Sequence, residues 1–270
     1  MNTDSSFYST LPGSDIKISR LGLGTVKFGR NEQVKYPSPF IIPDDQKVLS
    51  LLQQANDLGI NLLDTAPAYG NSEERLGKLL SNRQHWHIIT KVGEEFSQGK
   101  SHFDFSASHT RFSIQRSLER LKTDYLDIVL IHSDGNDENI LTRTDCLEEL
   151  KLFQEKGLIR KIGMSTKTEA GGILAASMLD IVMITYNLQQ QDETVLEKAA
   201  SLNKGILIKK GLMSGHVNGK NGEADSVRRS MELIFSRTAI NSMIVGTITP
   251  SHLQENVEKA KQILESQERS

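Results

Sequence analysis

The chain has 270 residues and carries 32 Lys and Arg against 34 Asp and Glu, a formal net charge of −2. So balanced a charge does not favour a nucleic acid or an anionic membrane as a partner. The single cysteine, Cys146, excludes an intrachain disulfide and a cysteine-rich metal site, and no metal site is predicted. No segment approaches the ~18 apolar residues of a membrane span. The N-terminus also lacks an apolar signal core, so we expect a cytoplasmic protein.

Eight short apolar runs, each able to form a buried strand, alternate along the chain with longer amphipathic stretches. Ile, Val and Leu fill the runs almost continuously, which is typical of parallel strands covered on both faces. In chain order the predicted strands are residues 19–24, 61–64, 87–91, 126–132, 159–165, 181–186, 205–209 and 242–247. The clearest predicted helices between them are residues 45–58, 72–80, 106–121, 144–156 and 250–264.

Eight strand-and-helix units over roughly 250 residues leave about 31 residues for each, the size of one βα repeat. We therefore predict an α/β fold, a closed (β/α)₈ TIM barrel, with residues 1–270 as one domain. The alternative is a doubly wound open sheet, which usually carries a glycine-rich dinucleotide-binding turn after its first strand. The turn at residues 22–29 lacks the third glycine of that motif, and this favours the barrel.

Two connections are longer than a barrel needs, and both follow predicted strands. Residues 27–44 hold three of the six prolines, and residues 94–105 hold three phenylalanines. Both segments should open on the C-terminal face of the barrel, where barrel enzymes build their active sites. Their aromatic residues either anchor the loops or contact substrate, and we expect these two loops to select the substrate.

Ionisable residues stand at the ends of three successive predicted strands. Asp64, Lys91 and His132 close the second, third and fourth strands, and Tyr69 follows Asp64 by five residues. A barrel directs such residues into one mouth. A tyrosine with its ordinary pKa of ~10 needs help to exchange a proton at neutral pH. Lys91 could lower that pKa, Asp64 could keep Lys91 charged, and His132 could hydrogen-bond a substrate oxygen. The set suits proton transfer to a carbonyl.

The segment LDTAPAYGNSEERLG at residues 63–77 resembles the signature of the aldo-keto reductase superfamily. The similarity continues through residues 117–127 and 157–165 and ends in 244–247 and 253–256. The resemblance implies a (β/α)₈ barrel that transfers a hydride between a nicotinamide dinucleotide and a small-molecule carbonyl. By the family pattern Tyr69 is the general acid, Lys91 and Asp64 tune it, and His132 orients the substrate oxygen.

The resemblance also implies where the cofactor lies, although several positions depart from the pattern. Thr166 stands where asparagine is usual, Met183 where glutamine is expected, and Lys209 where an aromatic ring usually stacks on the nicotinamide. The Lys209 stem could cover the nicotinamide, or its ammonium could pair with a phosphate. The implied cofactor-binding residues are Gly24, Thr25, Ser165, Thr166, Lys209, Lys210, Gly246, Thr247, His252, Glu255 and Asn256.

NADP is the expected cofactor on family grounds, with NAD possible. Residues 246–252 contain no Lys or Arg, so we predict a smaller preference for NADPH over NADH than an arginine clamp would give. The main prediction is a cytoplasmic NAD(P)-dependent reductase of aldehydes or ketones. Two alternatives stay open: a non-enzymatic NAD(P)-sensing or regulatory protein, and a Schiff-base lyase that uses Lys91. The sequence predicts neither the particular substrate nor the oligomeric state.

Overall fold

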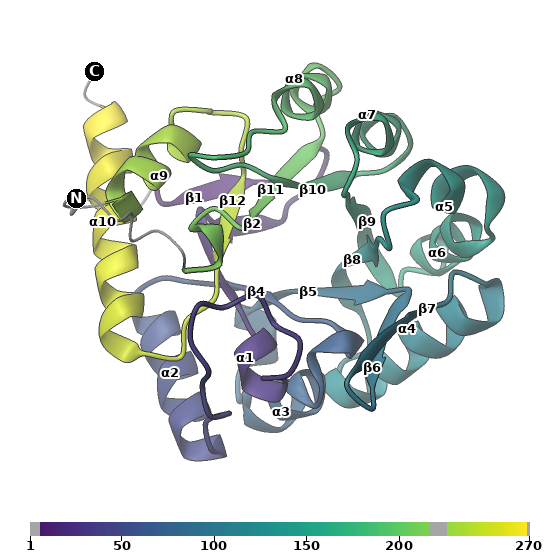
Figure 1. Ribbon diagram of the computed structural model, residues 1–270, viewed down its shortest axis with the longest axis horizontal. Coiled ribbons are helices and arrows are strands. Elements are labelled where there is room, and N and C mark those ends of the chain that lie inside the picture. The colour runs from purple at the N-terminus through teal and green to yellow at the C-terminus, as the bar shows by residue number, and fades with distance from the viewer. Residues whose placement is uncertain (1–5, 216–225, 269–270) are drawn as a thin grey trace.

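The computed structural model describes residues 6–215 and 226–268. Eight parallel strands pair edge to edge in the cyclic order β3-β4-β5-β8-β9-β10-β11-β12, and β12 pairs with β3 to close the ring. Helices pack around the outside of this ring (Figure 1). The predicted (β/α)₈ barrel is confirmed.

The barrel strands follow the predicted order closely. They are β3 (Leu21–Gly24), β4 (Leu62–Asp64), β5 (His87–Val92), β8 (Leu126–His132), β9 (Ile159–Ser165), β10 (Ile181–Thr185), β11 (Gly205–Lys209) and β12 (Ser242–Val245). The helices are α1 (Val26–Gly29), α2 (Asp45–Asp57), α3 (Ser72–Leu79), α4 (Ala107–Leu121), α5 (Asp137–Arg143), α6 (Cys146–Glu155), α7 (Glu169–Met178), α8 (Glu193–Ser201), α9 (Ser226–Phe235) and α10 (Pro250–Glu268). None of these helices is both long enough and apolar enough to cross a membrane.

Side-chain caps fix where several helices begin. The side chains of Asp44, Ser106 and Thr168 each accept a hydrogen bond from a backbone N–H three residues later. Each cap satisfies one of the N–H groups that a helix leaves free at its N-terminus. The caps therefore set the direction in which α2, α4 and α7 leave the mouth of the barrel.

An N-terminal hairpin closes the end of the barrel opposite the mouth. Its strands, β1 (Tyr8–Thr10) and β2 (Lys17–Ser19), pair antiparallel, so residue 19 belongs to this hairpin and the first barrel strand is shorter than predicted. Ile16 and Ile18 pack with inward-facing strand residues in a separate apolar cluster. Met183 lies in the same cluster and is buried. The methionine at the expected glutamine position thus fills the barrel interior.

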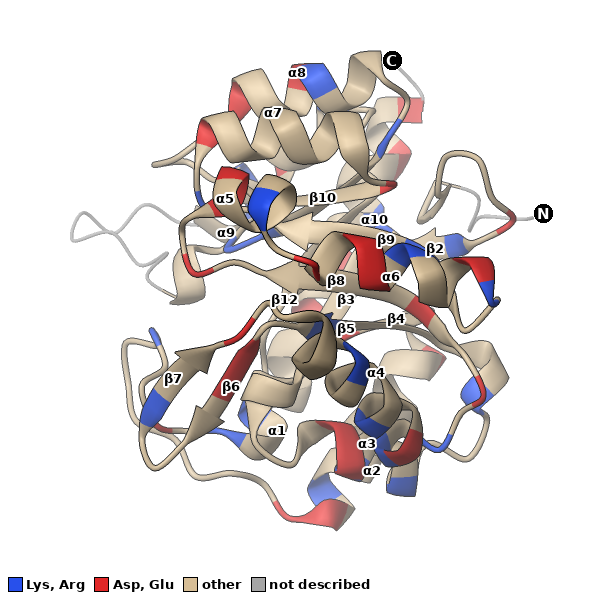
Figure 2. Ribbon diagram, turned by 90° about the vertical axis from the view of Figure 1, so that its right-hand side faces the viewer, with Lys and Arg blue, Asp and Glu red and all other residues tan. Residues whose placement is uncertain are grey.

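The segment after β5 is more ordered than the predicted loop. It forms an antiparallel hairpin of β6 (Glu94–Ser97) and β7 (Lys100–Phe103). Figure 2 shows this hairpin projecting on one side of the barrel, with β2 on the opposite side. The sequence pattern missed the hairpin because its residues are partly or fully exposed, so no apolar run marks them.

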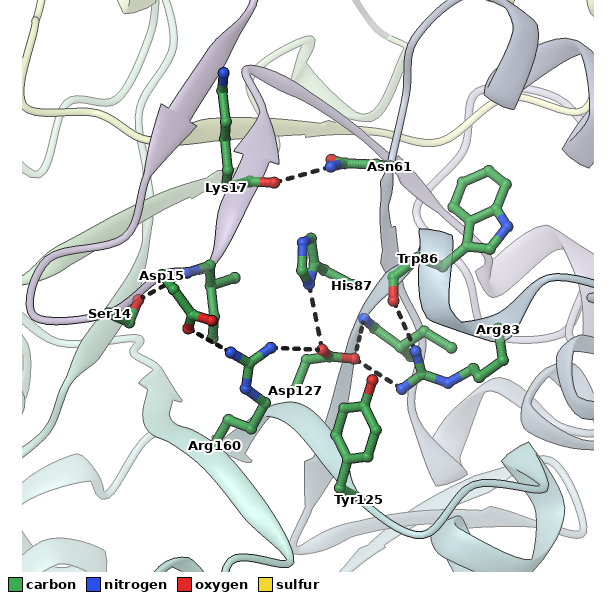
Figure 3. Close-up of polar contacts among 12 residues, drawn as sticks. Ser14, Asp15, Lys17, Asn61, Arg83, Trp86, His87, Tyr125, Asp127 and Arg160 are labelled. Atoms are coloured by element: carbon green, nitrogen blue, oxygen red, sulfur yellow. Dashed lines mark hydrogen bonds and ion pairs between the residues drawn. The ribbon is translucent and has the colours of Figure 1, made fainter.

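A buried carboxylate organises the end of the barrel opposite the mouth (Figure 3). Asp127, 1% exposed, accepts hydrogen bonds from Arg83 Nη2 at 2.7 Å and from the backbone N–H of Ile88 at 3.0 Å. Its other oxygen lies 3.2 Å from His87 Nδ1 and 3.7 Å from Arg160 Nη1. These contacts join β5, β8 and β9, so we assign Asp127 a role in stability.

Replacing Asp127 with Asn should lower the free energy of unfolding by ~3 kcal/mol at pH 7, because the partly buried Arg83 and Arg160 lose their buried counter-charge. Burial raises the pKa of Asp127, but His87 and Arg83 outweigh it and hold the pKa below its ordinary value. The stabilisation is therefore complete above the unfolded pKa of ~3.9 and disappears as pH falls through the lower folded pKa. Urea unfolding between pH 7 and pH 3 should show the difference shrinking, whereas the exposed control Asp124→Asn should change little.

Candidate active site

Tyr69 reaches the mouth from the short 3₁₀ turn η1 (Pro67–Tyr69) after β4. Two glycines press this turn against the loop after β3. A Cβ on Gly70 would lie 2.1 Å from the carbonyl oxygen of Gly29, and a Cβ on Gly29 would lie 2.3 Å from that of Tyr69. Gly70 also has a φ of +64°, which favours glycine. The local sequence therefore fixes where the tyrosine enters the site.

Lys91 and Asp64 form a buried ion pair beside Tyr69. Lys91 Nζ donates to Asp64 Oδ1 at 2.6 Å and to the carbonyl oxygen of Thr65 at 2.8 Å. Lys91 is 1% exposed, and its Nζ lies 4.7 Å from the centre of the Tyr69 ring. Neighbouring strands β4 and β5 supply the two charges, because parallel strand ends meet at one edge of the barrel.

The expected lowering of the Tyr69 pKa is wrong. Burial raises the pKa of Tyr69 well above its ordinary value, and the negative charges of Asp64 and Glu94 raise it further, while Arg30 opposes them. The main physical reason is burial, because removing the hydroxyl from water disfavours the charged tyrosinate. Tyr69 is consequently held in its protonated form, which is the form that donates a proton.

His132 stands on the far side of Tyr69, at the end of β8. The two rings are 6.2 Å apart and nearly perpendicular, at 84°. His132 Nδ1 lies 2.9 Å from Oε2 of Glu94. Glu94 is the first residue of the β6–β7 hairpin. Burial lowers the pKa of His132, Glu94 opposes this, and the charges of Lys91 and Lys209 add to the lowering. The four predicted catalytic residues thus surround one mouth.

Lys209 lies at the end of β11, across the mouth, and contacts the end of β9. Its Nζ donates to Ser165 Oγ at 2.9 Å and to the carbonyl oxygen of Thr166 at 2.5 Å. Burial and the like charge of Lys210 lower the pKa of Lys209 to about 7. The structure therefore brings three of the predicted cofactor residues, Ser165, Thr166 and Lys209, into one hydrogen-bonded group.

This side of the mouth carries positive charge suited to an anionic dinucleotide. Burial lowers the pKa of Lys210, and the positive charges of Lys35 and Lys167 lower it further. Lys35 and Lys167 are therefore close enough to Lys210 to act on it electrostatically. Lys35 and Lys210 line a cavity of about 260 Å³ together with Asn187 and Gln190. These lysines can attract an anionic cofactor locally, although the net charge of the whole chain is close to zero. The residues present therefore fit a nicotinamide dinucleotide.

The remaining predicted cofactor residues lie at three places: the end of β3, the segment after β12 and the start of α10. Gly24 ends β3, and Thr25 is buried, with its hydroxyl donating to the carbonyl oxygen of Asp64 at 2.9 Å. Gly246 and Thr247 follow β12 on the mouth side, and Thr247 Oγ1 accepts from the N–H of Thr249 at 3.1 Å. The other three lie in the first turns of α10, partly or fully exposed: His252, Glu255 and Asn256.

Three residues at the mouth were not predicted to act there: Arg30, Tyr36 and Glu94. Tyr36 comes from the proline-rich loop, and its hydroxyl lies 2.8 Å from where a Cβ on Gly246 would stand. Lys27 Nζ sits 3.9 Å from the Tyr36 ring centre. Burial above all, and the charge of Asp64, raise the Tyr36 pKa. The Gly93 that precedes Glu94, with φ +101°, was the available signal for a sharp turn into the site.

Comparisons with known proteins agree with this geometry. The profile of the Aldo/keto reductase family matches residues 20–233. A protein of known structure from Pseudomonas aeruginosa, assigned to the aldo-keto reductases, superposes with a TM-score of 0.86 at 48% identity over 95% of both chains. D-arabinose 1-dehydrogenase from Saccharomyces cerevisiae is 38% identical over 62% of this chain and 53% of its own length. NADH-specific methylglyoxal reductase from Escherichia coli is 30% identical over 65% of this chain and 57% of its own length. The chain belongs to the aldo/keto reductase family of oxidoreductases.

Proposed function

We propose that this protein reduces a small aldehyde or ketone to an alcohol with a nicotinamide dinucleotide as hydride donor. The observation that carries the proposal is the convergence of Tyr69, the Lys91–Asp64 pair and His132 on one mouth. A protonated tyrosine beside a histidine supplies what a carbonyl oxygen needs as it gains negative charge, a proton and a second hydrogen-bond donor.

Each residue then has a separate task. Tyr69 donates its hydroxyl proton to the carbonyl oxygen, and His132 hydrogen-bonds the same oxygen from the other side. The Lys91 ammonium, kept charged by Asp64, stabilises the tyrosinate that forms as the proton leaves. The raised pKa of Tyr69 keeps the proton in place until the substrate takes it.

The cofactor residues act by binding and orientation. Ser165 and Lys209 would hold the nicotinamide end, and Lys210, with the backbone around Gly246 and Thr247, would hold the phosphates. When bound, the dinucleotide supplies the hydride that adds to the carbonyl carbon. Carbon then gains the hydride and oxygen gains the tyrosine proton, which together give the alcohol.

Two observations bear on the choice of substrate and cofactor. Among the relatives, one is a D-arabinose dehydrogenase and one an NADH-specific methylglyoxal reductase, so small polar carbonyls are the first substrates to try. Residues 246–252 offer no Lys or Arg to a ribose phosphate.

The ion pair of Lys91 with Asp64 disfavours the Schiff-base alternative, because an ammonium is not a nucleophile.

Parallel fluorescence titrations with NADPH and NADH test the cofactor assignment. We expect both to bind, with dissociation constants within about 100-fold of each other, because no arginine clamps the extra phosphate. A carbonyl panel that includes methylglyoxal and pentoses follows, with oxidation of the preferred cofactor recorded at 340 nm. A thousandfold preference for NADPH would contradict the reasoning on residues 246–252. Tight binding without turnover of any carbonyl would favour the sensor alternative.

A further inference from the structure

We propose that Glu94 is a positioning residue for carbonyl reduction: its carboxylate lies against Nδ1 of His132 and orients the ring so that Nε2 faces the substrate oxygen. This inference rests on the proposed function and deepens it. It is carried by contacts of the β6–β7 hairpin, the element that the sequence pattern did not predict.

Both oxygens of the Glu94 carboxylate are held. Oε2 lies 2.9 Å from His132 Nδ1, while Oε1 accepts from Ser101 Oγ at 2.6 Å and lies 3.7 Å from Arg30 Nη1. The Glu94 and His132 side chains are 12% and 17% exposed. Ser101 pairs with Phe96 across the hairpin, so the hairpin itself supplies the hydroxyl that orients Glu94. A carboxylate fixed in this way leaves the imidazole little rotational freedom.

Arg30 connects the same carboxylate to the turn that carries Tyr69. Its guanidinium lies 3.5 Å from the centre of the Phe96 ring, and its Nη1 donates to the carbonyl oxygen of Ala68 at 3.1 Å. Ala68 directly precedes Tyr69. The two groups that face the substrate oxygen, Tyr69 and His132, therefore share one support, with Arg30 and Glu94 at its centre.

The consequence for His132 follows from the donor capacity of imidazole. A neutral ring that donates its Nδ1 proton to Glu94 has a bare Nε2, which only accepts hydrogen bonds. A carbonyl oxygen also only accepts, so His132 must be protonated on both nitrogens to bind it. A carboxylate at Nδ1 stabilises that cationic form. During reduction His132 then donates a hydrogen bond from Nε2 to the carbonyl oxygen and keeps its proton. The proton that is transferred comes from Tyr69.

The influences on His132 oppose one another. Burial, with Lys91 on β5 and Lys209 on β11, lowers the His132 pKa and outweighs Glu94 on β6, which raises it, so loss of the Glu94 charge should lower the His132 pKa further. Tyr69, 6.2 Å away, is protonated and adds no charge. Burial raises the pKa of Glu94, but His132, Ser101 and Arg30 outweigh it and hold the pKa at about 2. Glu94 is therefore ionised at every pH at which the enzyme would be assayed.

Glu94→Gln tests the proposal, because the amide places an oxygen of similar size beside Nδ1 but carries no charge. We expect the His132 pKa, measured by NMR on histidine-labelled protein, to fall by about one unit. For reduction, kcat/KM at pH 7 should drop roughly 10- to 100-fold, with the alkaline limb of the pH profile displaced to lower pH. The dissociation constant of NADPH should not change.

Glu95→Gln is the matched control. Glu95 lies next in β6 but pairs with Arg116 and His109, so removing its charge should leave the His132 titration and the reduction rate unchanged. Ser101→Ala provides a second variant if Glu94→Gln folds poorly. It should lower the His132 pKa and displace the alkaline limb of the pH profile in the same direction, but by less. An unchanged His132 pKa and pH profile in Glu94→Gln would overturn the proposal, even if activity fell. The NMR titration needs no turnover, so it separates this outcome from failure of the proposed function.

Discussion

Replacing Tyr69 with Phe should abolish carbonyl reduction while leaving cofactor binding intact. The substitution removes only the hydroxyl, and the ring can keep its contact with the Lys91 ammonium. Loss of a positioned general acid lowers rates by about 10²- to 10⁴-fold. We expect a loss at the upper end of this range, because His132 keeps its proton in the proposed reaction and cannot replace the tyrosine.

The measurement combines steady-state reduction of the best panel substrate with fluorescence titration of NADPH. Tyr125→Phe is the matched control, since Tyr125 lies near Asp127 at the opposite end of the barrel and stacks with Arg83 (Figure 3). This variant should retain full activity. Turnover within threefold of the parent by Tyr69→Phe would remove Tyr69 from the mechanism and leave the proton donor to be sought among Lys91, His132 and Tyr36.

The barrel could be predicted from the sequence because of how its strands are buried. β8 and β9 are mostly buried and are rich in Ile, Leu, Val and Met, so their predicted and observed bounds agree. The bounds at residues 19–24 disagree because β2 runs almost directly into β3, and the pattern of apolar residues does not mark the change of partner. The β6–β7 hairpin escaped prediction for the opposite reason, since its exposure leaves no apolar signal.

The site shows a similar division. Strand ends predicted that Asp64, Lys91 and His132 face one mouth, because barrel geometry alone decides this. The Tyr69 pKa could not be predicted, since it depends mainly on how deeply the hydroxyl is buried and on how near Asp64 and Glu94 lie. The contact of Lys209 with Ser165 joins residues 44 apart in the chain, and the Glu94–His132 contact joins residues from separate strands. Neither contact corresponds to a regular spacing of residues in the sequence, so neither could be predicted from it.

Replacing Lys91 with Met should remove activity and destabilise the protein, because the buried Asp64 carboxylate loses its counter-charge. Breaking a buried ion pair from one side lowers the free energy of unfolding by about 3–5 kcal/mol. The deficit relative to the parent should therefore be measurable by urea unfolding at pH 7.

A double variant separates the two effects. Asp64→Asn combined with Lys91→Met removes both charges, so stability should return toward that of the parent while reduction stays lost. Lys78→Met is the control at a surface pair: Lys78 donates to Asp45 at 2.8 Å, but both side chains are largely exposed, and the expected change in unfolding free energy is below ~1 kcal/mol. Urea unfolding of the four proteins measures this directly. Recovery of reduction by the double variant would show that the pair serves stability alone, and Tyr69 would then act without a neighbouring cation.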